Sequence, residues 1–288
     1  MKLCTFEYGG VRAAGIVVGD SILPIEKINV KRGAGFSTDL FTLIREQQID
    51  AVRDLAQGLE GETPLSEVRL CLPYQQPGKV WCIGLNYLSH AEDISAVQPE
   101  EPGSFMKPTS SFFEPDGDIE LPPERITQEV DAEGELAVVF GKRCREVPVE
   151  EIDAAVLGYT TTLDLTALDV LARNTRYLQR SKSFDTFFSF GPVIVTKDEV
   201  PDVHGLQVTT IHNGEVFSQD FVRNMRHTPE KLAAFHSDVM TFEPGDILST
   251  GCPKGARIQP GDTVEASIEG VGNLRANVKR RPEGKILA

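Results

Sequence analysis

The stretch DAEGELAVVFG, residues 131–141, decides how the rest of the chain is read. Its second half is apolar, and we expect a strand over residues 135–140. Successive side chains of a strand point to opposite faces, so Glu133 and Glu135 share a face and lie within about 7 Å of each other. Two like charges this close repel unless water or a cation separates them. Spacing alone fits either a solvated sheet edge or a cation site.

A third carboxylate occurs in the stretch GYTTTLDL, residues 158–165, where Asp164 lies between two leucines of another expected strand. A buried aspartate needs a partner such as an arginine, a set of N–H groups or a metal ion. Three carboxylates without cysteine or histidine ligands make a hard oxygen site, which suits Mg²⁺ or Mn²⁺ better than Zn²⁺. Glu133, Glu135 and Asp164 are therefore candidate metal ligands.

Strands dominate the chain on both sides of this stretch. Residues 1–24 alternate around glycine-containing turns and predict short antiparallel strands, and residues 39–58 have the spacing of one or two helices. A polar segment then separates a small N-terminal α/β domain, residues 1–70, from a main domain, residues 71–288. Further strands are expected at residues 79–83, 157–163, 192–195, 206–211, 215–219, 246–249, 263–268 and 273–278, and a helix over 229–240. Asn213-Gly214 predicts a hairpin turn. We expect an α+β, β-rich fold, a folded sandwich or roll.

Composition excludes several classes of protein. The 288 residues carry 29 basic and 43 acidic side chains, a net charge of −14, which argues against a nucleic-acid partner and against an anionic membrane surface. No apolar run approaches the roughly 20 residues of a membrane span, and the N-terminus lacks the apolar core of a signal peptide. Five widely spaced cysteines favour a reducing, cytoplasmic location. Phosphate-binding loops, dinucleotide fingerprints and serine-hydrolase elbows are absent from the sequence.

Three further segments contain candidate functional residues. Lys182 lies among hydroxyl and aromatic residues and is either a surface lysine or a cation that stabilises an anionic substrate. His90 and Asp93 share one face of an expected helical turn, the arrangement of a general base, although a surface pair is the more frequent outcome. Residues 249–255, STGCPKG, follow a strand and either present backbone N–H groups to a ligand or simply turn.

Taken together, these segments resemble the fumarylacetoacetate hydrolase family over about residues 70–280. Any single motif is weak, but the ordered set is specific. The motifs are GLNYxxH at 84–90, xKP at 106–108, DxEGELAVVxGK at 131–142, GYTxxxD at 158–164, KSFDTF at 182–187, EPGDI at 243–247 and TGxP at 250–253.

The resemblance implies the mixed β-roll of that family with a small N-terminal domain, usually as a homodimer. It implies an enzyme that binds Mg²⁺ or Mn²⁺ at Glu133, Glu135 and Asp164 and acts on a small β-diketo or 2-oxo acid. The first reaction implied is hydrolytic C–C cleavage of an acylpyruvate-like acid through a metal-bound enolate. The implied catalytic residues are His90, Asp93 and Lys182, and the implied substrate-binding residues are Tyr159, Thr250, Gly251 and Cys252.

The sequence departs from the family pattern at a few positions. Asp93 stands where smaller members have glutamate, Leu168 and Leu171 stand where arginine and glutamine are typical, and Cys252 replaces the second threonine of TGTP. The two leucines favour a less polar group near the substrate. They also keep open an impaired homologue that binds a metal and an anion without turnover. A further alternative is an isomerase, hydratase or decarboxylase of 2-oxo acids on the same scaffold.

Overall fold

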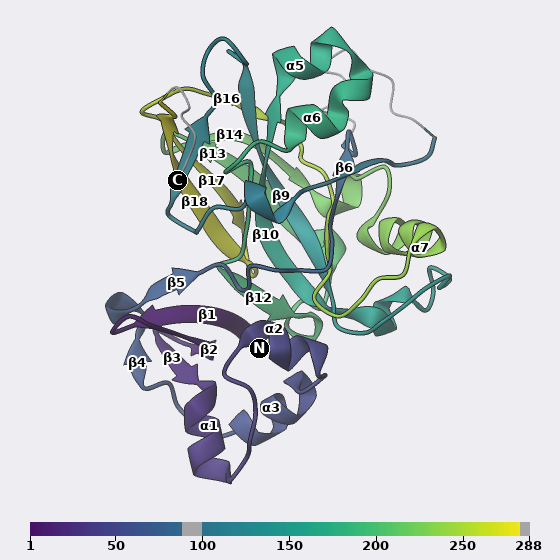
Figure 1. The fold of residues 1–288 in the computed structure, drawn as a ribbon. Coiled ribbons are helices and arrows are strands. Elements are labelled where there is room, and N and C mark those ends of the chain that lie inside the picture. Colours follow the sequence, from purple (N-terminus) through teal and green to yellow (C-terminus); the bar gives the residue numbers. More distant parts are fainter. Residues whose placement is uncertain (88–99, 283–288) are drawn as a thin grey trace.

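The computed structural model describes residues 1–87 and 100–282 and has two sheets, shown in Figure 1. The larger sheet runs in the order β4-β3-β2-β1-β12-β10-β9-β15-β6-β7, with β5, β11 and β16 attached beside this path. The smaller sheet runs in the order β14-β13-β17-β18-β8. Most neighbouring strands are antiparallel, but β15 pairs with β6 and β18 with β8 in parallel. The predicted β-rich α+β fold with mixed sheets is confirmed.

The N-terminal segment forms the lower part of Figure 1, drawn in purple and blue. Its first strands and its two predicted helical turns are confirmed, and a further helix follows β3. The elements are β1 (Lys2–Tyr8), β2 (Val11–Val18), β3 (Ser21–Pro24), α1 (Ile25–Arg32), α2 (Leu40–Arg45), α3 (Ile49–Ala56), β4 (Thr63–Pro64) and β5 (Arg69–Cys71). Because β1 pairs with β12, the larger sheet continues across residue 70. The domain boundary there stays a prediction.

The centre of the larger sheet is the long antiparallel pair β9 (Val130–Phe140) and β10 (Val156–Ala167). Strand β9 begins five residues before the predicted strand, because the acidic residues at its start are also paired with β10. Around the pair lie β6 (Val80–Gly84), β7 (Gly103–Met106), β11 (Phe188–Phe190), β12 (Val193–Thr196), β15 (Ile247–Ser249) and β16 (Ala256–Ile258). The expected strands at 79–83, 192–195 and 246–249 are thereby confirmed.

The smaller sheet packs against one face of β9 and β10. It contains β8 (Asp118–Leu121), β13 (Gln207–His212), β14 (Glu215–Phe221), β17 (Thr263–Ile268) and β18 (Gly272–Arg280). The turn between β13 and β14 has φ of 53° at Asn213 and 82° at Gly214, which confirms the predicted Asn-Gly hairpin. Leu163 and Leu165 of β10 join Ala266 and Leu274 of this sheet in one buried apolar cluster.

Short helices lie at the ends of the central strands. Helix α5 (Leu168–Arg173) continues directly from β10, and α6 (Leu178–Lys182) follows it; Figure 1 shows both beyond one end of the β9–β10 pair. Helix α7 (Pro229–Val239) begins after Thr228, whose side chain accepts from the Lys231 N–H, as the Thr-Pro pair predicts. Within the described part of the chain, no helix combines the length and the apolar character needed to cross a bilayer.

Candidate active site

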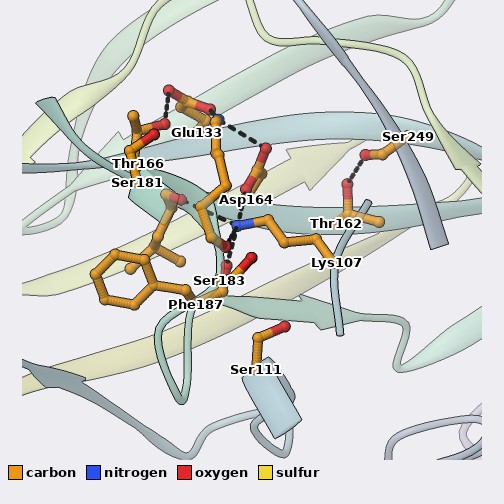
Figure 2. A network of polar contacts seen from close by, with 12 residues as sticks. Lys107, Ser111, Glu133, Thr162, Asp164, Thr166, Ser181, Ser183, Phe187 and Ser249 are labelled. Carbon is orange, nitrogen blue, oxygen red and sulfur yellow. Dashed lines mark hydrogen bonds and ion pairs between the residues drawn. The ribbon is translucent and has the colours of Figure 1, made fainter. Parts of the chain in front are cut away.

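Three buried carboxylates lie on one face of the β9–β10 pair. Glu133 stands directly opposite Asp164 in the strand register, and Glu135 stands opposite Thr162, so their side chains share a face. The exposed fractions are 6% for Glu133, 1% for Glu135 and 0% for Asp164. Figure 2 shows Glu133 and Asp164 pointing toward each other. The spacing of the two glutamates also fitted a solvated sheet edge, and their burial shows that this alternative is wrong.

Lys182 lies between two of these carboxylates. Its Nζ is 2.6 Å from Glu133 Oε2 and 2.8 Å from Asp164 Oδ2, and it lies 4.7 Å from the centre of the Phe105 ring. Burial alone would lower the pKa of Lys182, but the charges of Asp164 and Glu133 outweigh it and raise that pKa. Lys182 is the last residue of α6 and is only 5% exposed, so the surface-lysine interpretation is wrong.

A second buried lysine, Lys107, was not selected from the sequence. Its Nζ lies 2.5 Å from Asp164 Oδ1 and donates to the carbonyls of Leu165, Lys182 and Phe187. Burial lowers the pKa of Lys107, while the charge of Asp164 acts in the opposite sense. The only signal for it was the lysine of the xKP motif at 106–108, whose partners come from distant parts of the chain.

Glu135 is held by a different set of partners. Its Oε2 accepts from the Ser249 hydroxyl at 2.6 Å and from the Gly251 N–H at 3.0 Å. Burial, and then the charges of Asp164 and Glu133, raise the pKa of Glu135 to about 8. Below that pH a neutral Glu135 leaves two carboxylates, those of Glu133 and Asp164, facing the two lysines.

Gly134 explains why the two glutamates can share this face. It points to the opposite face, where its N–H donates to Thr210 Oγ1 at 3.1 Å. A Cβ atom at this position would lie 2.8 Å from the same Oγ1 and 3.1 Å from the Ala266 side chain. The smaller sheet thus approaches the β9 backbone too closely for a side chain, and the sequence Glu-Gly-Glu combines that approach with two carboxylates on the other side.

The loop after β15 brings three of the predicted substrate-binding residues to Glu135. The Thr250 hydroxyl donates to the Leu136 carbonyl, the Gly251 N–H binds Glu135, and Cys252 follows with 3% of its surface exposed. Burial, then the negative charges of Glu133 and Glu135, raise the pKa of the Cys252 thiol well above its usual value.

Ligand atoms of Glu133, Glu135 and Cys252 all lie within 4.8 Å of one another. Such a group of buried donors fits a divalent ion. Asp164 is outside this group of mutually close atoms, because its two oxygens face Lys107 and Lys182.

Other polar residues missed from the sequence support the carboxylates. Thr166 donates to Glu133 Oε1 at 2.8 Å, and Thr162 lies 2.7 Å from Ser249, as Figure 2 shows. The side chain of Asn86 donates to the carbonyls of Thr250 and His227 and accepts from the His227 N–H. Asn86 occurs in the GLNY motif, which was the only sequence signal for it.

Not every predicted site residue reaches this face. Tyr159 lies on the opposite face of β10, directly across from Val138, and packs in the apolar cluster that contains Leu136 and Phe140. The strand alternation therefore directs it away from the carboxylates, which corrects the expectation that it lines the same site. His90 and Asp93 fall outside the described residues.

Comparisons with known proteins identify the family of this chain. Residues 79–279 match the family described as fumarylacetoacetate (FAA) hydrolase C-terminal. The chain is 42% identical over 215 residues to an uncharacterized protein of Archaeoglobus fulgidus, covering 74% of this chain and 83% of that protein. It is 39% identical over 218 residues to the human mitochondrial oxaloacetate tautomerase FAHD2B, covering 73% and 69%.

The fold is also similar to that of a solved structure. Maleylpyruvate hydrolase from Sphingobium sp. SYK-6, in complex with manganese (II) ion and pyruvate, superimposes with a TM-score of 0.80. It is 30% identical and the match covers 98% of this chain and 100% of the other. The family match covers residues 79–279, which include the buried carboxylates of β9 and β10. This chain therefore belongs to the fumarylacetoacetate hydrolase family.

Proposed function

We propose that the protein is a divalent-metal-dependent enzyme that acts on a small 2-oxo or β-diketo acid. Its first candidate reaction is hydrolytic cleavage of a C–C bond in an acylpyruvate-like substrate. One observation carries the proposal: the buried carboxylates Glu133, Glu135 and Asp164 share one sheet face with the ammonium group of Lys182. The maleylpyruvate hydrolase relative, which contains manganese and pyruvate, supports it.

Glu133, Glu135 and Asp164 are the carboxylates that would hold the ion. Carboxylate oxygens suit Mg²⁺ or Mn²⁺, and all three of these carboxylates are buried. When bound, such an ion polarises a substrate carbonyl and stabilises negative charge on its oxygen. The close approach of the Glu133 and Glu135 ligand atoms supports this assignment.

Lys182 would stabilise charge that develops on the substrate. Its ammonium group is fixed by two carboxylates and by the Phe105 ring in a water-poor site, where a positive charge acts strongly on a nearby anion. The protein as a whole has a net charge of −14, so an anionic substrate meets a repulsive field until it reaches this site. The lysine and the metal ion together would supply the local attraction.

Hydrolysis also needs a base that activates water. His90 with Asp93 is the proposed pair, and this part of the proposal rests on the GLNYxxH spacing alone. The residues Thr250, Gly251 and Cys252 are proposed to line the substrate beside Glu135. Because the Thr250 hydroxyl already donates to the Leu136 carbonyl, its contribution there is to hold the loop. A homodimer and a cytoplasmic location stay predictions.

A second candidate function is tautomerisation, isomerisation or decarboxylation of a 2-oxo acid. The human mitochondrial oxaloacetate tautomerases FAHD2A and FAHD2B are 38–39% identical to this chain, above the 30% of the maleylpyruvate hydrolase. Leu168 and Leu171 of α5 are half-buried, and neither supplies the polar group that is typical of the family at its position. Proton transfer at a carbon beside a carbonyl needs no attacking water.

Product analysis separates the candidates. The purified protein is assayed with Mg²⁺ or Mn²⁺ on an acylpyruvate and on oxaloacetate, and the products are identified by mass spectrometry. Cleavage gives two acids, decarboxylation gives CO₂, and tautomerisation conserves mass while changing the enol absorbance. We expect turnover to require the metal and to be lost in Glu135→Gln but kept in Lys279→Met, which alters an exposed ion pair.

Two results would contradict the proposal. Full metal-dependent turnover by Glu135→Gln would show that the reaction does not need the Glu135 carboxylate as a metal ligand. Tight binding of pyruvate or oxalate with metal, without turnover of either substrate class, would support the impaired binding protein instead.

A further inference from the structure

Cys252 is the third member of the close group of ligand atoms, and it is a departure from the family pattern. Its Sγ lies within 4.8 Å of ligand oxygens of both Glu133 and Glu135, and all three residues are buried. The Cys4 and Cys71 thiols contact backbone carbonyls at 3.6 and 3.7 Å. Within the described residues, the Cys252 thiol has no such hydrogen-bond partner. It is thus an unpartnered, buried sulfur beside two carboxylates.

The backbone fixes the thiol in this place. Gly251 has a φ of +91°, and a Cβ there would lie 2.9 Å from the Asn86 Cβ. Asn86 in turn donates to the Thr250 carbonyl at 2.8 Å, while the Gly251 N–H binds Glu135 at 3.0 Å. These contacts of the two preceding residues fix the position of the Cys252 backbone beside the carboxylates.

Asp164 is differently placed. Both of its oxygens face ammonium groups, Lys107 at 2.5 Å and Lys182 at 2.8 Å, and it is not part of the close group of ligand atoms formed by Glu133, Glu135 and Cys252. We propose that Cys252 is a ligand of the divalent ion held by Glu133 and Glu135 and shifts the preference of the site toward softer ions such as Zn²⁺ and Co²⁺. This inference rests on the metal site of the proposed function.

The chemistry of the donor set explains the expected preference. Sulfur binds Zn²⁺ and Co²⁺ well and Mg²⁺ poorly, whereas carboxylate oxygens bind all three. On binding, the thiol gives its proton to solvent and coordinates as the thiolate. Cys252 would thus add one sulfur donor to the carboxylates that the proposed function assigns to the ion.

The test uses cobalt as an optical probe of the full-length protein. One equivalent of Co²⁺ should produce a near-ultraviolet sulfur-to-cobalt charge-transfer band that is lost in Cys252→Ser and kept in Cys144→Ser, a control at another buried cysteine. We expect Cys252→Ser to weaken Zn²⁺ binding by about 10–100-fold and to leave Mg²⁺ binding unchanged within about threefold. Binding is measured by competition with a chelating dye.

A second measurement needs no variant. X-ray absorption of the zinc-loaded wild-type protein should show one sulfur neighbour at about 2.3 Å. A Co²⁺ complex that depends on Glu135 but lacks both the band and the sulfur neighbour overturns the role of Cys252 and leaves the carboxylate site of the proposed function standing. If the wild-type protein shows no Co²⁺ binding that depends on Glu135, both the role of Cys252 and the carboxylate metal site of the proposed function are overturned.

Discussion

The two faces of the β9–β10 pair differ in almost every physical respect. One face carries Glu133, Glu135 and Asp164 with two lysines. The other carries Leu163, Leu165 and small residues that pack on the second sheet. Both faces are buried, so burial alone does not distinguish a structural face from a functional one. The carboxylate face costs desolvation energy that only paired charges and hydrogen bonds offset, which is why its partners are so numerous.

Within the carboxylate face, the two lysines also differ. Lys107 uses its ammonium group on Asp164 and on three backbone carbonyls, so no donor is left for a substrate. Lys182 contacts two carboxylates and an aromatic ring. This difference predicts that one lysine mainly stabilises the fold and the other mainly serves the reaction, and substitutions can test it.

Lys107→Met should have the largest effect on stability. It leaves Asp164 with one of its two ammonium partners and removes the Lys107 donor from three backbone carbonyls, and breaking a buried ion pair costs about 3–5 kcal/mol. The free energy of unfolding is measured by urea denaturation, with the exposed Lys279→Met as control. A loss no larger than that of the control would show that the lysine is not what holds these strands and loops together.

Lys182→Met should mainly affect the reaction. Removing a charge that stabilises a developing anion lowers kcat by about 10²–10³-fold. The far-ultraviolet circular dichroism of the variant should match that of the wild type. An unchanged kcat at saturating metal would show that Lys182 does not take part in the reaction, and the proposed functional difference between Lys182 and Lys107 would be wrong.

Gly134→Ala tests the apolar face. Its new Cβ would lie 2.8 Å from Thr210 Oγ1, so the smaller sheet must shift, and overpacking of this kind costs about 1–3 kcal/mol. Thermal denaturation measures the loss. If metal affinity falls together with stability, the two faces are mechanically coupled; if only stability falls, they are independent.

The pH dependence of stability belongs to the carboxylate face. The pKa of Glu135 is about 8 in the metal-free folded protein, above the ordinary 4.5 of a glutamate. Between these values the folded state binds more protons than the unfolded state, so the free energy of unfolding falls as the pH rises from about 4.5 to 8. Glu135→Gln should remove this slope, and the exposed Glu150→Gln should keep it; denaturation of metal-free protein at several pH values measures both.

Much of the fold was predictable because its signals are local. Alternation in residues 1–24, the Asn213-Gly214 turn and the Thr228 cap each depend on a few neighbouring residues. Helices α5 and α6 were not predicted, since they are only six and five residues long and lie between elements that pack around them. Short helices gain their stability from tertiary packing and carry little periodicity.

The site was predictable only in part for a similar reason. Glu133 and Glu135 share a face by strand geometry, so spacing was informative. Tyr159 was placed wrongly because a motif does not say which face of the strand each member occupies. Lys107 and Asn86 were missed because their partners are distant in sequence, as with Asn86 and Thr250. Such contacts are set by topology, and no local pattern encodes them.

All five cysteines are buried, and burial raises the pKa of every one of their thiols. A thiol that is both covered and protonated reacts with an alkylating reagent only when the structure opens around it. The protein therefore contains five built-in reporters spread from β1 to the loop after β15. The order in which they become labelled would map which parts of the molecule open first, without any added probe.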